Sequence, residues 1–477
     1  MKKNKLVKDI FGNCDIHPEL MSRRDALKYL SLSPVAASVI ASATITSSDL
    51  EAADVKGKIV IVGGGSGAIM ALSRLYRAIK NPDITIIAPN DVHLYQPGQV
   101  FVGAGVMQME DILLDNNDYI NSGEVTWIKD EVAHFDADNN NVTTRKGEKV
   151  SYDYLVVATG VQYNYEQIKG LTKEDIGTNG IASVYLSDLE KGTSKGATDT
   201  WQWFKDLKKA ASKDEKQKVI FTHPNTAIKC GGGPQKMLLL AADYLKQDGL
   251  SADFTFVASL KELFFLPKID AALHKAQERY GFIENKLQHH LESIDVKNKK
   301  AIFTHAWVES VYDKDFDVTE NLSRSERIEL DYDFIHITPP MSPVKALIES
   351  KLLGDTGWLD VDKYTLQHKK YKNVFGIGDT CGIPMGKTGG SARHHGPVLT
   401  QNLIDVMQGK EPSEKFDGYT VCPIKTQYGK IMMTEFNYEG PSTTLPLNFE
   451  EPRWMWWAFD LYMLKPMYQY LMLTGRF

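Results

Sequence analysis

The stretch that decides the fold is KIVIVGGGSGAIM, residues 58–70. Its apolar start predicts a short buried strand, and the run after its glycines has the periodicity of a helix. The turn between them matches G-x-G-x-x-G/A, in which glycine allows a tight turn and a close approach of the backbone to a pyrophosphate. The free N–H groups of the following helix favour phosphate. The expected cofactor-binding residues of this turn are Gly63, Gly65, Ser66, Gly67 and Ala68.

Two later segments favour FAD as the dinucleotide. YDYLVVATG ends a predicted strand in Thr159 and Gly160, and YKNVFGIGD ends another in Gly378 and Asp379. In flavoproteins with two dinucleotide domains, a late strand returns to the first sheet and places such an aspartate beneath the ribitol of FAD. An enzyme that binds only NAD needs no late strand that returns to its first sheet, so these residues are expected to bind FAD.

One position departs from the dinucleotide pattern. The strand predicted over residues 83–87 is followed by Ala88, where an acid usually holds the adenosine ribose. Asn90 or Asp91 in the next loop would have to substitute for it. The ribose contact is therefore left open.

A second βαβ stretch follows the first. KVIFTHP and ADFTFVAS predict parallel strands that flank a helix beginning near Pro234. An NADH site needs glycines directly after the first of these strands, but Phe221 is followed by THPN, and Pro224 lacks a backbone donor. The glycines 231–233 come about ten residues late. We expect a second Rossmann-like domain that serves as a scaffold and no longer binds NADH.

Cys230 precedes those late glycines and the predicted helix. Lys229 and Lys236 lie near it in the sequence, and a helix start with nearby lysines lowers the pKa of a thiol. The loop is therefore interpreted as one rebuilt around a reactive cysteine.

The composition excludes several classes of protein. A chain of 477 residues implies two or three domains, with 43% hydrophobic and 24% charged residues typical of a folded protein. The net charge of −6 argues against a nucleic-acid surface. None of the four cysteines lies in a C-x-x-C pair, so no zinc site or other metal centre is predicted.

The N-terminus predicts an export signal. SRRDALK contains Arg23 and Arg24, a weakly apolar run follows, and residues 41–43 form an A-x-A-like cleavage site. The pattern resembles a twin-arginine signal, although Ala26 stands where Phe is usual. The alternative is a short amphipathic helix with a basic face. We expect residues 1–45, with Cys14, to be removed on export to the periplasmic face of the cytoplasmic membrane.

The C-terminus, EPRWMWWAFDLYMLKPMYQYLMLTGRF, is rich in aromatic residues. Trp454, Trp457, Leu461 and Leu464 fall on one helical stripe, and Pro466 is expected to break the segment into two short helices. Neither is long enough to span a bilayer, but both suit the lipid headgroup region. The alternative is an aromatic dimer interface, so a homo-oligomer stays open.

Several long motifs occur in an order that resembles sulfide:quinone oxidoreductases, most of all the branch that includes the mitochondrial enzymes. These motifs are AIKCGGGPQKMLLLAADYL, ITPPMSPV, GWLDVDKYTLQHKKYKNVFGIGD, PMGKTGGSA and YTVCPI. The resemblance implies FAD, sulfide and a membrane quinone as partners, and a membrane-bound C-terminal region. It also implies that Cys230 is the thiol next to the flavin, that Cys422 carries the persulfide, and that Lys387 lies near the flavin and the quinone.

The expected fold class is α/β, with two Rossmann-type domains, of which the FAD domain is discontinuous, and a C-terminal membrane-binding region. The expected bounds are 1–45 for the signal, 57–185 and 316–410 for the FAD domain, 186–315 for the second Rossmann-like domain, and 411–477 for the C-terminal region.

Three residues near the flavin motif fall outside the family pattern. Cys381 is interpreted as a small buried residue, with an additional redox sulfur as the alternative. His394 and His395 are interpreted as local polar packing, with a proton route to the quinone as the alternative.

Three other functions compete with the leading one. The first is the flavin subunit of a flavocytochrome c sulfide dehydrogenase, which needs no membrane tail. The second is a type II NADH:quinone oxidoreductase, which the missing glycine pattern after Phe221 opposes. The third is an FAD protein that binds polysulfide without efficient turnover.

Overall fold

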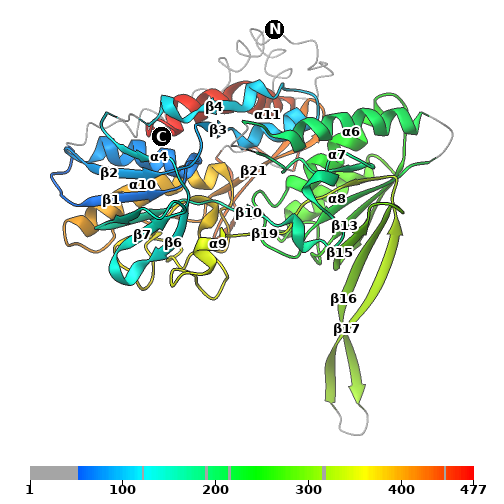
Figure 1. The fold of residues 1–477 in the computed structure, drawn as a ribbon. Coiled ribbons are helices and arrows are strands. Elements are labelled where there is room, and N and C mark those ends of the chain that lie inside the picture. The colour runs from blue at the N-terminus through cyan, green and yellow to red at the C-terminus, as the bar shows by residue number, and fades with distance from the viewer. Residues whose placement is uncertain are drawn as a thin grey trace. The chain divides into compact units, whose positions relative to one another are not determined.

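The computed structural model describes residues 52–120, 123–188, 192–212, 216–313, 318–444, 447–448 and 450–477 (Figure 1). The predicted export signal lies outside these residues. The chain forms two compact units. Unit 1 holds the described residues up to Tyr95 together with Leu114–Val161 and Pro343–Phe477, and unit 2 holds Gln96–Leu113 and Gln162–Ser342. The domain bounds expected from the sequence stay a prediction.

The centre of unit 1 is a parallel five-stranded sheet in the order β20-β9-β1-β2-β5. Its strands are β1 (Lys58–Val62), β2 (Asp83–Ile87), β5 (Thr126–Ile128), β9 (Tyr154–Val157) and β20 (Val374–Gly376). The inner strands are almost wholly apolar and buried, as in parallel sheets covered on both faces. Because β20 joins this sheet beside β9, the predicted late return of the chain to the first sheet is confirmed.

Helices α4 (Ser66–Ala78) and α10 (Gly389–Met407) pack against each other beside this sheet. A separate antiparallel sheet of β6 (Val132–Asp136), β7 (Asn141–Thr144) and β8 (Lys149–Ser151) leads into β9. Further short elements are the strands β3 (Val92–Leu94), β4 (Leu113–Asp115), β10 (Gln162–Tyr163) and β19 (Met341–Ser342) and the helices α5 (Gln99–Gly103) and α9 (Lys345–Ile348).

Unit 2 has its own parallel sheet in the order β11-β18-β12-β13-β14. Its strands are β11 (Ile181–Ala182), β12 (Lys218–His223), β13 (Asp253–Ala258), β14 (Ile283–Leu287) and β18 (Phe334–His336), and its helices are α6 (Lys195–Ala211), α7 (Gly233–Lys246) and α8 (Pro267–Glu278). The predicted parallel strands and the helix near Pro234 are confirmed. Proline at a first helical position loses no hydrogen bond, which explains why α7 begins there. The α/β class with two Rossmann-like sheets is therefore confirmed.

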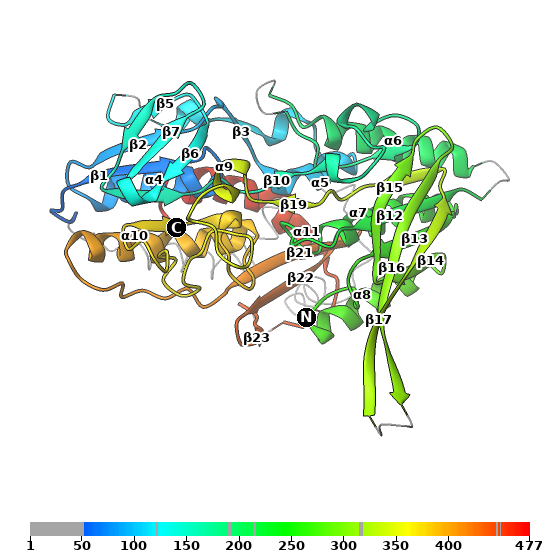
Figure 2. The ribbon, with the colours of Figure 1, turned by 60° about the horizontal axis from the view of Figure 1, so that its bottom comes forward.

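A long antiparallel ribbon in unit 2 was not predicted from the sequence. It consists of β16 (Lys300–Asp313) and β17 (Val318–Asp331), with β15 (His289–Asp295) pairing only along the first part of β16. Figure 2 shows β16 and β17 continuing as two strands beyond β15. Near its base the ribbon packs into the core of unit 2 through Phe303, whereas farther out Val308 is 58% exposed.

The C-terminal part of unit 1 begins with an antiparallel sheet of β21 (Thr420–Gln427), β22 (Lys430–Asn437) and β23 (Gly440–Pro441). A continuous helical segment follows, made of α11 (Trp454–Phe459), a π-helical turn (Asp460–Leu464), α12 (Lys465–Met467) and a second π-helical turn (Tyr468–Met472).

The prediction that Pro466 splits this segment is wrong. Proline lacks an N–H and clashes with the carbonyl group four residues earlier in an α-helix, but the wider π turns on both sides accommodate it. Among the described residues, no helix is both long and apolar enough to cross a membrane.

Candidate active site

The turn between β1 and α4 has the geometry that a dinucleotide needs. Gly63 has a φ of +129°, and a Cβ at this position would lie 2.3 Å from the carbonyl oxygen of Ala158, so only glycine fits. Its N–H donates to the carbonyl oxygen of Ile87 at 2.9 Å and holds the turn against β2. Helix α4 starts at Ser66, directly after Gly65, and the N–H groups of a first helical turn have no acceptor within the helix.

Open space lies on one side of this turn. A Cβ added to Gly65, Gly160 or Gly378 would meet no atom within 4 Å. These glycines follow the carboxyl ends of β1, β9 and β20, which are neighbours in the sheet. Thr159 and Thr380 share a hydrogen bond of 3.1 Å between their hydroxyl oxygens and tie the last two strands together. The space at the carboxyl ends of these strands fits the predicted FAD.

Lys387 lies beside the turn that carries Asp379. Its Nζ donates to the carbonyl oxygens of Asp379 at 2.6 Å and Cys381 at 3.0 Å, and lies 3.5 Å from the ring centroid of Trp358. Burial lowers the pKa of Lys387 to about 8, although Asp379 opposes the shift. The side chain therefore changes its charge close to neutral pH, where a group can both stabilise an anion and donate a proton.

His395 holds the same turn from α10. Its Nδ1 accepts the N–H of Gly378 at 3.1 Å, and burial lowers the pKa of His395 to about 3, so the ring is neutral. The adjacent His394 stacks on Tyr419 with ring centroids 4.0 Å apart. Both histidines therefore make local packing contacts, and His395 in addition fixes the backbone of a residue expected to bind FAD. The sequence carried no signal for that second role.

The loop that departs from the ribose pattern is held by neighbouring polar groups. Nδ2 of Asn116 donates to the carbonyl oxygen of Asn90 at 3.0 Å, and Nε1 of Trp127 donates to that of Ala88 at 3.0 Å. The carboxylate of Asp91 pairs with Lys129 at 2.5 Å on the surface. The loop is ordered without an acid at position 88, and the ribose contact stays a prediction.

Cys230 lies in unit 2 on the loop between β12 and α7. It adopts a φ of +52°, which is uncommon for a residue other than glycine. Lys236, in the first turn of α7, donates from Nζ to the Sγ of Cys230 at 3.0 Å. Lys236 is only 5% exposed, so solvent screens its charge weakly. The sequence prediction that a lysine lies near this thiol is confirmed for Lys236.

Two further residues of unit 2 near Cys230 have polar or aromatic contacts of their own. Lys229 donates from Nζ to the Oε1 of Gln96 at 2.6 Å and lies 4.9 Å from the ring centroid of Tyr163. Tyr185 is buried, and burial together with the negative charge of Cys230 raises its pKa well above the usual range. Tyr185 therefore stays a neutral hydroxyl.

The other two described cysteines lie in unit 1 and differ in environment. Cys422 is 2% exposed in β21, opposite Thr434 of β22, whose hydroxyl donates to its carbonyl oxygen at 2.6 Å. Cys381 is fully buried, and burial raises the pKa of its thiol to about 12, as expected of an unreactive packing residue. Because Cys230 and Cys422 belong to different units, their pairing stays a prediction.

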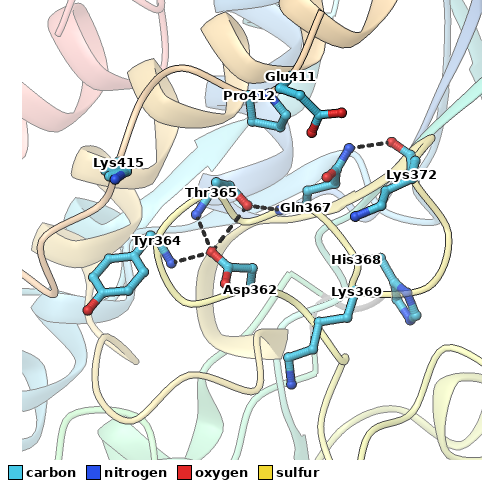
Figure 3. Close-up of a pocket in the computed structure, with 10 residues that line it drawn as sticks. All are labelled: Asp362, Tyr364, Thr365, Gln367, His368, Lys369, Lys372, Glu411, Pro412 and Lys415. Atoms are coloured by element: carbon cyan, nitrogen blue, oxygen red, sulfur yellow. Dashed lines mark hydrogen bonds between the residues drawn. The ribbon is translucent and has the colours of Figure 1, made fainter.

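A shallow pocket of about 430 Å³ lies elsewhere on unit 1 (Figure 3). Its polar groups stabilise their own loop: Asp362 accepts the N–H groups of Tyr364 and Thr365 at 2.9 Å, and Gln367 donates to the carbonyl oxygen of Lys372 at 2.8 Å. Lys372 precedes the amino end of β20, whereas the dinucleotide turn follows the carboxyl end of β1. The pocket therefore lies near the amino ends of the strands, whereas FAD is expected at their carboxyl ends.

Comparisons with known proteins agree with this arrangement. A family model described as pyridine nucleotide-disulphide oxidoreductase matches residues 57–402. Two relatives are named mitochondrial sulfide:quinone oxidoreductase. The one from Dictyostelium discoideum is 37% identical and the one from Mus musculus is 33% identical, and each alignment covers 88% of this chain and 86% of the relative.

A solved structure shares the fold. The sulfide:quinone oxidoreductase from the hyperthermophilic bacterium Aquifex aeolicus superposes with a TM-score of 0.66 at 18% identity, covering 88% of this chain and 92% of that one. The chain therefore belongs to the pyridine nucleotide-disulphide oxidoreductase family and, within it, to the mitochondrial-type sulfide:quinone oxidoreductases. This membership supports FAD as the cofactor.

Proposed function

We propose that this protein oxidises hydrosulfide and passes the electrons through FAD to a membrane quinone. The observation that carries the proposal is the contact between Cys230 and the buried ammonium group of Lys236. The loop between β12 and α7 carries this thiol where a nucleotide-binding βα unit has its phosphate loop. Relatives of the chain are named sulfide:quinone oxidoreductase.

We assign the electrophilic sulfur to a disulfide between Cys230 and Cys422. HS⁻ attacks Cys422, the S–S bond breaks, Cys422 becomes a persulfide, and Cys230 leaves as a thiolate. Lys236 stabilises this thiolate as it forms. A thiolate acceptor then takes the outer sulfur as its own persulfide and leaves Cys422 as a thiolate. The two cysteines re-form their disulfide by giving up two electrons.

When bound, FAD supplies the sink for these two electrons, and a quinone takes them up together with two protons. The turns around Gly63 and Gly378 would hold the cofactor, and Lys387 lies beside the second of them. Below its pKa of about 8, Lys387 carries a positive charge, which would stabilise negative charge on a cofactor bound at these turns. It also holds a proton that the quinone can receive.

An anaerobic titration of the purified protein tests the function. Sulfide is expected to bleach the flavin absorbance within one turnover, and a short-chain quinone is expected to restore it. NADH is expected to leave the absorbance unchanged, because Thr222, His223 and Pro224 replace the glycines of an NADH site. Bleaching by NADH but not by sulfide would identify an NADH:quinone oxidoreductase instead. Turnover of one equivalent of sulfide and no more would identify a binding protein.

We further propose that the C-terminal helical segment lies in the plane of a lipid surface, where it receives the quinone. Half-exposed apolar side chains follow one another along this segment, and such side chains suit the boundary between headgroups and acyl chains. They are Trp454, Phe459, Leu461, Tyr462, Met463, Leu464 and Met467.

We assign residues 1–45 to twin-arginine export, which places this surface on the periplasmic face of the membrane.

Substituting two of these side chains tests the membrane proposal. The double variant Leu461→Gln and Leu464→Gln is expected to bind lipid vesicles at least about tenfold more weakly, because each leucine loses a contact with acyl chains. Ile348→Gln is the matched control, since Ile348 is an exposed apolar residue elsewhere in unit 1. Vesicle flotation measures binding, and cell fractionation shows whether the wild-type protein reaches the periplasmic side. Equal binding of the double variant and the control would contradict the proposal.

A further inference from the structure

The end of the C-terminal segment lies along the helix that carries the dinucleotide turn. Two side chains of α4 donate to its backbone: Oγ of Ser73 bonds the carbonyl oxygen of Leu473 at 2.6 Å, and Nε of Arg77 bonds that of Thr474 at 3.0 Å. These contacts join residues about 400 positions apart in the sequence. The segment that carries the half-exposed apolar side chains is therefore also attached to α4, the helix that follows the dinucleotide turn.

A chain of buried hydrogen bonds runs from Tyr468 to the dinucleotide turn. Nδ2 of Asn116 donates to the carbonyl oxygens of Gly64 at 3.2 Å and Asn90 at 3.0 Å, so its Oδ1 faces His93 as an acceptor. Nδ1 of His93, 2.9 Å from that oxygen, therefore carries the proton, and Nε2 accepts from the Tyr468 hydroxyl at 2.5 Å. Burial lowers the pKa of His93 to about 4, which keeps the ring neutral.

The hydroxyl of Tyr468 also reaches the start of α4. The side chain of Ser66, the first residue of that helix, lies near this hydroxyl. The Tyr468 ring packs on Tyr95 with centroids 5.0 Å apart, and Tyr468 is only 9% exposed. The hydroxyl thus lies near Ser66 on one side of the turn, and His93 and Asn116 link it by hydrogen bonds to Gly64 on the other side.

We propose that Tyr468 is a positioning residue for the FAD pyrophosphate turn, so that the C-terminal segment is part of the cofactor site. The N–H groups at the start of α4 bind a pyrophosphate well only when the turn keeps one geometry. The Tyr468 hydroxyl holds Gly64 of this turn through His93 and Asn116. The proposal rests on the FAD part of the proposed function and on none of its sulfide or quinone chemistry. It also implies that FAD binding and the docking of this segment favour each other, since coupling between two sites is reciprocal.

The test compares Tyr468→Phe with Tyr470→Phe. Phenylalanine at position 468 keeps the ring against Tyr95 and removes only the hydroxyl, whereas Tyr470 is 64% exposed on the same segment and serves as the matched control. Apoprotein is titrated with FAD and the quenching of flavin fluorescence is followed. We expect the dissociation constant of Tyr468→Phe to rise about three- to tenfold, the effect of losing about one hydrogen bond, and that of Tyr470→Phe to match wild type.

A second measurement separates positioning from general stability. A purely structural loss would lower the melting temperatures of apoprotein and holoprotein alike and leave the rise caused by FAD unchanged. Positioning predicts a smaller rise at equal FAD concentration, because stabilisation by a ligand follows its affinity. Unchanged affinity and an unchanged rise in Tyr468→Phe would overturn the proposal. The assay contains neither sulfide nor quinone, so its outcome is independent of the sulfur chemistry.

Discussion

Replacing Cys230 with serine is expected to abolish the anaerobic bleaching of the flavin by sulfide, with a rate lower by on the order of 10³-fold or more. Serine keeps the size of the side chain and can accept a hydrogen bond from Lys236. It cannot form a disulfide, and its hydroxyl is not ionised at neutral pH, so neither the electrophile nor the electron donor remains. Stopped-flow absorbance of the flavin after mixing with sulfide measures the rate.

Cys422→Ser is expected to cause the same loss, because the proposed disulfide needs both sulfurs. Cys381→Ala is the control among the described cysteines, since burial raises the pKa of the Cys381 thiol to about 12 and keeps it protonated. All three variants should retain FAD, and flavin absorbance of the purified proteins checks this. If either serine variant holds FAD and is still reduced by sulfide at the wild-type rate, the assignment of the Cys230–Cys422 pair fails.

The parts of the fold that the sequence predicted are those specified by neighbouring residues. The dinucleotide turn is one example, because the backbone at Gly63 admits no side chain and the helix must start within three residues of the strand. The second unit is another, because Pro224 and the late glycines identify a lengthened loop before α7. The strand β20 itself follows from its local motif, which ends in Gly378 and Asp379, whereas its place beside β9 was expected from flavoproteins in which such a strand returns to the first sheet.

The parts that the sequence did not predict depend on residues far apart in the chain. His93 and Tyr468 are separated by 375 positions, and neither belongs to a motif. His395 supports Gly378 through a contact that only the packing of α10 creates. The ribbon of β16 and β17 gave no signal because its outer part buries neither face, so no apolar alternation marks it.

The C-terminal stripe shows how local periodicity can mislead. A π-helical turn advances the chain by more residues than an α-helical turn, so the two such turns in this segment shift the faces that a 3.6-residue period assigns. Trp457, placed on the membrane-facing stripe, is only 6% exposed. Asp460, which directly precedes Leu461 of that stripe, is buried in an ion pair with Lys425 of β21. Part of the predicted lipid face therefore packs inside the protein.

This packing changes how the membrane proposal has to be tested. Deleting residues 450–477 would remove the exposed apolar side chains, but it would also remove Tyr468 and the partner of a buried lysine. Loss of quinone activity in such a deletion would follow from loss of FAD as readily as from loss of membrane binding. Point substitutions at half-exposed positions such as Leu461 and Leu464 avoid this ambiguity.

Lys236→Met is expected to slow flavin reduction by sulfide about ten- to a hundredfold at neutral pH, and the loss should diminish as the pH rises. The ammonium group of Lys236 lies 3.0 Å from the Cys230 sulfur in a buried setting, where an opposite charge strongly favours the thiolate. Without it, the thiolate forms only at higher pH, so the pH of half-maximal rate should rise by about one to two units. Stopped-flow rates measured across a pH series give this midpoint.

Two variants on the same helix separate this effect from a structural one. Lys236→Arg keeps a positive charge at every pH and should restore the lower midpoint, whereas Lys246→Met removes an exposed lysine from the last turn of α7 and should change neither rate nor midpoint. Alkylation of Cys230 in the reduced protein, followed by peptide mass spectrometry across the same pH series, reports the thiolate without any turnover. If the alkylation midpoints of Lys236→Met and wild type coincide, Lys236 does not stabilise the thiolate, and another group must take that role in the release of Cys230 from the disulfide.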